Sequence, residues 1–475
     1  MESILYKQNY TKTVEDTVAV ALRAGTDLNC GSFYSNYTQQ ALDKQTIVEA
    51  DIDQAVTRAY EGLIRLGYFD SPEVQPYRQI LPSVVDTPAS RQFTLEAAQQ
   101  SMVLLKNSNK ALPLSLDQLK TKKIALIGPT ANATVLMQGN YHGLAPYLTS
   151  PLMGFQTIVQ GYSIDIQYAM GCQVKDNDTS GFAEALELAR SADVVIFFAG
   201  LNLTVEKEGH DRIAIVLPDI QTMLMQELEK VVRSPMHVIL LAGSSLDLSN
   251  IRDSPQYASL LWAGYPGQSG GTAIASVIFG QYNPGGRLPI TFYPAAYVDQ
   301  VSMFDMSMRP STNNPGRTYK FYTGQPIFEF GFGLSYTTFS YQWANDSISE
   351  SYSIQTLTKH TPHNVNIQMQ SFRVNVTNTG TMDGDDIVLA YVVPPQEPRA
   401  GQTPPIKQLF GFDRVHLVVN ETKQIFFPFN IETLLSVARD GSKWLHQGEY
   451  RIVVGKQHMF TIVLHGDSVL WKRFR

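Results

Sequence analysis

Asp193 to Arg212 reads DVVIFFAGLNLTVEKEGHDR, an apolar run followed by a loop rich in charge. Residues 194–198 are all apolar, which is typical of a strand buried on both faces of a parallel sheet. The charged loop would then leave the carboxyl end of a central strand, the edge where ligands bind in open α/β sheets. Loops of this composition are more often solvent-exposed surface without a function. Evidence from the rest of the sequence is therefore needed to distinguish such a loop from a ligand-binding loop.

Strands and helices alternate around this stretch, from Lys122 to Pro294. The expected strands are 123–128, 164–169, 193–200, 237–243, 259–264 and 288–293. The expected helices are 181–190, 219–232 and 269–279. This alternation predicts an αβα sandwich at residues 91–300, with a mostly parallel sheet covered by helices on both faces. The turn after the first strand lacks the glycine spacing of a dinucleotide site, so no cofactor is expected.

The first 75 residues contain one short strand, expected at 24–31 (AGTDLNCG), between two amphipathic helices. Thr13 can cap the first helix, and the second runs from about Glu49 to Leu66. A strand without a partner leaves two open edges, so this region is predicted to be the tail end of a larger αβ domain. A proline-rich linker at 76–90 and a long helix at about 91–106 are expected to follow.

The carboxyl-terminal part has a different periodicity. A long irregular segment is expected at 301–345, before a last domain at 346–475. Within that domain, alternating apolar residues predict strands at 372–377, 387–392, 425–430, 450–454 and 459–464. Short strands at this spacing predict a β-sandwich of immunoglobulin or fibronectin type.

Composition limits the partners and the compartment. The net charge of -6 argues against nucleic acid or an anionic membrane as the main partner, and no apolar run is long enough to span a bilayer. Cys30 and Cys172 could pair or stay free. Asn-x-Ser/Thr triplets occur at Asn9, Asn36, Asn132, Asn177, Asn202, Asn345, Asn375 and Asn420. So many acceptor triplets predict passage through the secretory route, although no signal peptide follows Met1.

Four motifs, in this order, resemble family 3 glycoside hydrolases of the β-xylosidase-like branch. They read ADVVIFFAGLNLTVEKEGHDR, LLWAGYPGQSGGTAIASVIFGQYNPGGRLPITFYP, MRPSTNNPGRTYKFY and FGFGLSYTTF. The resemblance implies that residues 1–75 are the C-terminal remnant of a (β/α)8 barrel, followed by an αβα sandwich and a fibronectin type III-like domain. It also implies retaining hydrolysis of a β-linked sugar from the non-reducing end, in which one carboxylate is the nucleophile and another is the acid/base.

By this resemblance the acid/base is Glu208, with Glu206 as the fallback. Glu206 or Asp211 could supply the negative charge that keeps an acid protonated, while Arg212 could oppose it or anchor the loop. We also expect Glu206, Asp211 and Arg212 to contact substrate. Asp27, at the end of the expected first strand, is a further candidate, although a capping turn is an equal interpretation.

Two other features are interpreted as structural. His210 has no second histidine at a metal-ligand spacing, so no metal is expected. Trp262, with Tyr265 nearby, could stack on a sugar but more often such a tryptophan belongs to the core.

One motif of the family is not found in this sequence. In the family, the nucleophilic Asp lies in a Ser-Asp motif just before the segment equivalent to residues 2–4, so its counterpart would lie upstream of Met1. We therefore expect a truncated chain that does not hydrolyse sugars alone, from a secreted exo-acting β-xylosidase that cleaves xylo-oligosaccharides. The alternative is a non-catalytic carbohydrate-binding or structural module. Xylose, arabinose and glucose stay open as the sugar, as does the oligomeric state.

Overall fold

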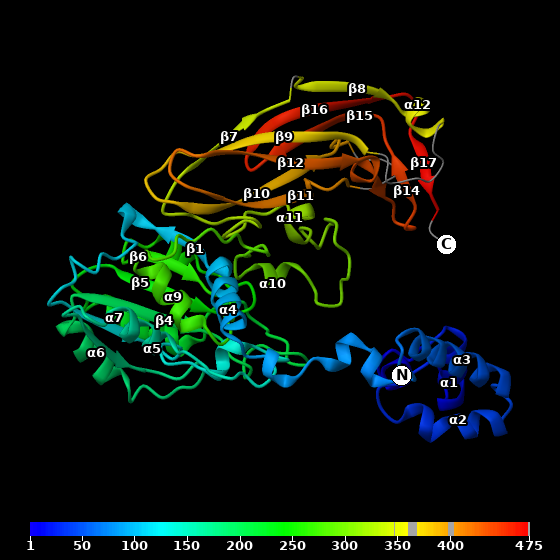
Figure 1. Ribbon diagram of the computed structural model, residues 1–475, viewed down its shortest axis with the longest axis horizontal. Coiled ribbons are helices and arrows are strands. Elements are labelled where there is room, and N and C mark those ends of the chain that lie inside the picture. Colours follow the sequence, from blue (N-terminus) through cyan, green and yellow to red (C-terminus); the bar gives the residue numbers. More distant parts are fainter. Residues whose placement is uncertain (346, 360–367, 398–402, 474–475) are drawn as a thin grey trace. The chain divides into compact units, whose positions relative to one another are not determined.

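The computed structural model describes residues 1–345, 347–359, 368–397 and 403–473. The chain divides into two compact units, Met1–Thr87 and Pro88–Arg475, and each is described by itself (Figure 1). No helix in the described ranges is both long enough and apolar enough to cross a membrane. Both cysteines are free thiols.

The first unit is helical. Its elements are η1 (Ser3–Lys7), α1 (Val14–Arg23), α2 (Phe33–Asp43), α3 (Glu49–Arg65) and the 3-10 turns η2 (Pro72–Val74), η3 (Pro76–Gln79) and η4 (Pro82–Val84). Thr13 caps α1 as predicted, because its hydroxyl accepts the backbone N–H of Asp16 at 3.1 Å. Val18, Phe33 and Ile47 lie in the small core between the helices.

The strand expected at 24–31 is wrong. These residues form turns and extended chain, and residues 1–87 contain no strand with which they could pair. An isolated strand has no ladder to satisfy its backbone groups. Instead, side chains organise this segment: Asp27 pairs with Arg58 of α3 at 2.6 Å, and the Tyr34 hydroxyl donates to the carbonyl of Thr26 at 2.7 Å.

The second unit contains a six-stranded sheet in the order β1-β6-β5-β4-β2-β3. The strands are β1 (Val103–Asn107), β2 (Lys123–Ile127), β3 (Asp165–Ala169), β4 (Val194–Gly200), β5 (Met236–Leu241) and β6 (Tyr257–Trp262). The last five run parallel, and only the edge strand β1 pairs antiparallel, with β6. The predicted, mostly parallel sheet with β4 in its interior is therefore confirmed.

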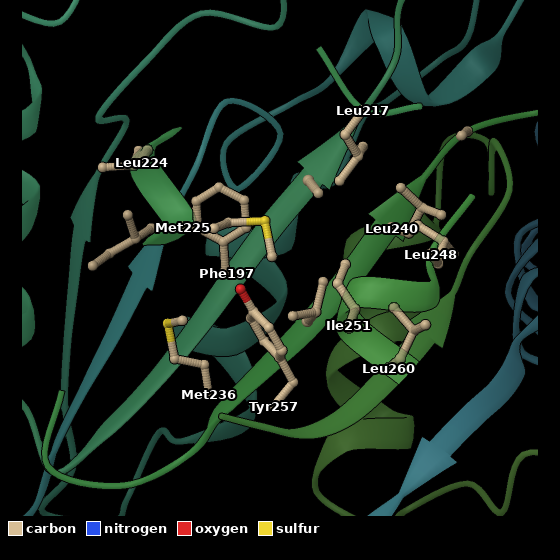
Figure 2. Close-up of a cluster of buried hydrophobic side chains, with 14 of the residues drawn as sticks. Phe197, Leu217, Leu224, Met225, Met236, Leu240, Leu248, Ile251, Tyr257 and Leu260 are labelled. Atoms are coloured by element: carbon tan, nitrogen blue, oxygen red, sulfur yellow. The ribbon is translucent and has the colours of Figure 1, made fainter. Parts of the chain in front are cut away.

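Both faces of the sheet are buried. Phe197 of β4 points into one core with Leu224 and Leu260, shown in Figure 2, and its neighbour Phe198 packs into a second core with Phe155. Helices contribute to the first core from α6 (Phe182–Ser191), α7 (Asp219–Glu229) and α8 (Ser249–Asp253). Those of the second core are α4 (Pro88–Ser101), α5 (Pro151–Ile158) and α9 (Gly270–Ile278). Two-sided burial explains why β4 reads as an unbroken apolar run.

Two expectations for this domain are wrong. The helix expected to reach residue 106 ends at Ser101, because residues 103–107 pair with β6 as strand β1. Residues 288–293 form no strand: only Phe292 makes an isolated bridge, to Phe328. Pro289 and Pro294 lack the N–H groups that a longer ladder would need.

A β-sandwich ends the chain, as predicted. Its sheets are β11-β10-β15-β16-β8 and β12-β9-β7, with a small sheet β13-β14-β17. The strands are β7 (Phe339–Trp343), β8 (Ser349–Ser353), β9 (Gln368–Asn378), β10 (Gly384–Val393), β11 (Gln408–Leu417), β12 (Thr422–Asn430), β13 (Ser436–Val437), β14 (Lys443–Leu445), β15 (Gly448–Val454), β16 (Gln457–His465) and β17 (Val469–Lys472).

The remaining elements are short helices. They are η5 (Ser108–Lys110), η6 (Val135–Gln138), α10 (Tyr297–Gln300), α11 (Thr318–Phe321), α12 (Ile354–Lys359) and η7 (Ile431–Leu434). The irregular segment expected at 301–345 is shorter than expected, because β7 at its end already pairs with β9 of the sandwich.

His237 makes the α/β sheet sensitive to acid. It lies on β5, is 6% exposed, and its Nδ1 is 2.8 Å from the Ser259 hydroxyl of β6. Burial lowers its pKa from 6.5 to about 4. Between pH 6.5 and about 4, His237 is therefore protonated in the unfolded chain but neutral in the folded chain. The free energy of unfolding decreases as the pH falls through this range.

We expect this difference to remove about 3 kcal/mol of unfolding free energy at the acidic end of that range. Urea unfolding of wild type and His237→Asn at several pH values measures it, and the variant should show a shallower decline. His142→Gln, at an exposed histidine, is the matched control. Equal pH slopes for wild type and His237→Asn would contradict the assignment.

Candidate active site

The loop after β4 ends in a tight turn that exposes Glu208. The loop starts with the carbonyl of Asn202, which accepts the backbone N–H of Glu206 at 2.9 Å. His210 N–H then donates to the carbonyl of Lys207 at 3.1 Å, and Gly209 has a φ of +71° inside that turn. A positive φ suits glycine, so the sequence Glu-Gly fixes Glu208 at the corner of the turn.

Glu206, in contrast, is held by three donors from two neighbouring strands. Gly243 N–H donates at 2.8 Å and the Tyr265 hydroxyl at 2.6 Å to Oε1, while the Ser244 hydroxyl donates to Oε2. Gly243 and Ser244 follow β5, which pairs directly with β4, and Tyr265 follows β6, the next strand beyond β5. A Cβ at position 243 would lie 2.9 Å from the Tyr265 ring, so only glycine fits there.

Burial and nearby charge shift the pKa values of Tyr265 and Arg212 beside Glu206. Burial raises the pKa of Tyr265 above its ordinary value, and the hydrogen bond to Glu206 raises it further, so its hydroxyl stays a donor. Burial lowers the pKa of Arg212, while the charge of Glu206 opposes this effect. Arg212 donates through Nη2 to the carbonyl of Ser245 at 3.1 Å.

The other guanidinium nitrogen of Arg212 is a donor in need of an acceptor. Nη1 is buried and makes no hydrogen bond within the described part of the chain. A buried donor without an acceptor costs about 1–3 kcal/mol, so Nη1 calls for an acceptor such as an ordered water or a ligand oxygen.

Glu208 and Asp211 form the open half of the loop. Both side chains are exposed, and no residue in the described ranges hydrogen-bonds to either carboxylate. The structure thus brings Glu206 and Arg212 together around Tyr265 and leaves Glu208 and Asp211 free to meet an incoming molecule.

The remaining sequence candidates have structural partners. Asp27 lies in the helical unit, where the hydrogen bond from Arg58 lowers its pKa despite some burial. Trp262 belongs to the core, as favoured, because it is buried, contacts Phe292 edge-on, and donates through Nε1 to the carbonyl of Ala242 at 2.8 Å.

Sequence reasoning missed Gly243 and Ser244 as donors to Glu206, and it considered Tyr265 only as a ring near a possible sugar contact. Gly243, Ser244 and Tyr265 each follow a buried strand in the motifs HVILLAGSS and SLLWAGYPG. Because parallel strands end at one edge of the sheet, polar residues directly after each strand were the available signal.

Comparison with known proteins gives matches over most of the chain. Residues 102–336 match the glycosyl hydrolase family 3 C-terminal domain, and residues 386–458 match the fibronectin type III-like domain. A probable exo-1,4-beta-xylosidase of Aspergillus fumigatus is 40% identical over 460 residues, which cover 96% of this chain and 58% of that protein. A beta-xylosidase/alpha-L-arabinofuranosidase of Medicago sativa subsp. varia is 38% identical, covering 97% and 60%.

A solved structure shows the same fold. It is a family 3 exo-beta-xylosidase in complex with a xylobiose aziridine activity-based probe, with a TM-score of 0.89 and 36% identity. The match covers 98% of this chain and 60% of that one, so this chain spans about three fifths of the length of its relatives. The chain therefore belongs to glycosyl hydrolase family 3, whose C-terminal domain it carries at residues 102–336, followed by a fibronectin type III-like domain.

Proposed function

We propose that this chain is the acid/base-bearing part of a retaining, exo-acting β-xylosidase that releases xylose from xylo-oligosaccharides. The proposal is supported by relatives named as xylosidases, at 36–40% identity over nearly the whole chain. Because the chain spans only 58% of such a relative, the activity, the substrate and a secretory location are all inferred for the complete protein.

The observation that carries the proposal is the contrast between the two glutamates. An acid/base must reach the glycosidic oxygen, give it a proton, and later take one from water. Glu208 is exposed on a turn, and its carboxylate has no partner in the described residues. Glu206 already accepts from Gly243 and Tyr265 and is better suited to fix the loop.

Arg212 and Asp211 complete the proposed substrate contacts from this loop. The buried Nη1 of Arg212 needs an acceptor, and sugar hydroxyls and ring oxygens supply one. Asp211 is exposed next to it and can accept from a hydroxyl. Asp27 stays a candidate contact only if a substrate can compete with its ion pair to Arg58.

The proposed reaction needs a second carboxylate as nucleophile. In retaining enzymes the two carboxyl groups lie about 5–5.5 Å apart, on opposite sides of the bond that is cleaved. The nucleophile attacks the anomeric carbon while Glu208 protonates the departing oxygen, and water activated by Glu208 then releases the sugar. We propose that the nucleophile belongs to the part of the family's fold that this chain does not match.

The test compares the chain alone with the chain joined behind the segment of the Aspergillus fumigatus relative that it does not match. We expect the joined protein to release β-xylose from xylobiose and the chain alone to release none, as followed by NMR of the first product anomer. Xylose release by the chain alone would refute the proposal that the nucleophile belongs to a part of the fold that this chain does not match. A folded joined protein that binds xylobiose without cleaving it would favour a binding module.

A further inference from the structure

The asparagines of the Asn-x-Ser/Thr triplets differ in whether their side chains make hydrogen bonds within the fold. Asn345 is occupied in the fold, because its Nδ2 donates to the carbonyl of Ser371 at 3.1 Å and its Oδ1 accepts Arg373 N–H at 2.7 Å. A sugar on that nitrogen would replace one of its two hydrogens and would have to fit beside the bond to Ser371. Asn177 is exposed in a loop and carries no such constraint.

Asn375 is unusual because its triplet lies in the middle of strand β9. Its neighbours Val374 and Val376 point into the core of the sandwich, so Asn375 lies on the outer face of the sheet β12-β9-β7. Gln424 of β12 donates to its Oδ1 at 3.0 Å. No described residue accepts a hydrogen bond from its Nδ2, the nitrogen to which a glycan is attached.

The same face carries an exposed aromatic ring beside Asn375. Phe426 of β12 is 57% exposed and lies opposite Arg373 of β9. The next pair on this face, Gln424 with Asn375, is polar. Asn375 and Phe426 are diagonal neighbours on adjacent strands, about 7–8 Å apart and within reach of a large side chain. Burying an apolar ring that is otherwise wetted stabilises the folded state.

We propose that Asn375 carries an N-linked glycan whose first N-acetylglucosamine packs its C–H face on the ring of Phe426. The sugar is joined through Nδ2, so the Oδ1 that accepts from Gln424 stays available. The glycan also lies beside β12, which among the described strands is the edge of this sheet next to β9. This inference rests on the proposed secretory location, but not on the hydrolase activity.

Glycopeptide mass spectrometry of the full chain, secreted from a eukaryotic host behind a cleavable leader, tests occupancy. We expect a glycan at Asn375 in wild type and in Thr377→Ser, which keeps the triplet, but not in Thr377→Ala. An unmodified Asn375 in a sample that is glycosylated at Asn177 would overturn the site. A protein without glycan at any triplet would overturn the site and would also remove the acceptor triplets as an argument for a secretory location.

A double-mutant cycle tests the packing. The melting temperatures of wild type, Asn375→Gln, Phe426→Thr and the double variant are compared for protein from the secretory host, where the other triplets stay intact. We expect Asn375→Gln to lower the melting temperature of wild type and to have little effect once Phe426 is replaced. In protein from a bacterial cytosol this coupling should disappear, and equal coupling in both hosts would refute sugar packing.

Discussion

Glu208→Gln is expected to lower kcat for xylobiose about 10²- to 10⁴-fold in the joined, active protein. Glutamine keeps the size of the side chain but cannot give a proton to the departing sugar oxygen. Because Glu208 is exposed and has no hydrogen bond to any described residue, the substitution removes no structural contact. The melting temperature should therefore stay that of the wild type while the rate falls.

The dependence on the leaving group separates an acid from a merely helpful neighbour. Dinitrophenolate leaves without a proton, so Glu208→Gln should form the glycosyl-enzyme normally from a dinitrophenyl xyloside and be slow only in its hydrolysis. Rapid-quench measurements should then show a burst of dinitrophenol, and added azide should restore turnover because it needs no general base. These signatures follow from the two roles of one residue in a retaining reaction.

Glu206→Gln is the matched control in the same loop. Glu206 accepts from Gly243, Ser244 and Tyr265, so its replacement should disturb the loop and lower the rate for good and poor leaving groups alike. A burst and azide rescue in Glu206→Gln, with neither in Glu208→Gln, would exchange the two roles.

Burial on both faces explains how much of the fold could be predicted. Strands such as β4 read as continuous apolar runs because Phe197 and Phe198 enter different cores, and β9 alternates because only one of its faces is buried. Strand β1 was missed because the apolar residues 103–105 continue the pattern of α4. Their pairing with β6 is a contact between residues far apart in the sequence, which local periodicity does not report.

The sequence predicted which loop forms the candidate site, but it did not predict the hydrogen bonds that hold Glu206. The motif identified both glutamates, yet spacing alone does not say which of them turns toward Gly243. That choice depends on the turn at Gly209 and on the position of Tyr265, which comes from a different strand. The expected strand at Asp27 failed for a related reason, since a strand needs partners that a local sequence window does not contain.

Asp386 forms a buried ionic link between the α/β domain and the β-sandwich. It lies on β10 with a fully buried side chain, and its Oδ1 is 2.6 Å from Nη2 of Arg287, which follows α9. Its Oδ2 accepts from the hydroxyl of Tyr341 on β7 at 2.6 Å. Arg287 also donates to the carbonyl of Gly333, so both of its partners belong to the unit Pro88–Arg475.

Asp386→Asn is expected to lower the free energy of unfolding by about 3 kcal/mol, because it leaves the guanidinium of Arg287, whose side chain is only 18% exposed, without a counter-charge. Urea unfolding followed by tryptophan fluorescence measures the change. Asp413→Asn, at an exposed aspartate on the neighbouring strand β11, is the matched control and should stay within about 0.5 kcal/mol of wild type.

The double variant Arg287→Met with Asp386→Asn shows whether the uncompensated charge is the cause. It removes the buried cation, and the asparagine can still accept from the Tyr341 hydroxyl, so much of the lost stability should return. If the double variant is instead less stable than Asp386→Asn alone, then the contacts of Arg287 with Gly333 and its surroundings, rather than the ion pair, connect the two domains. A loss in Asp386→Asn no larger than in Asp413→Asn would mean that the pair contributes nothing to stability, and other links between the domains, such as the Tyr282 hydroxyl with Asp385, would then have to join them.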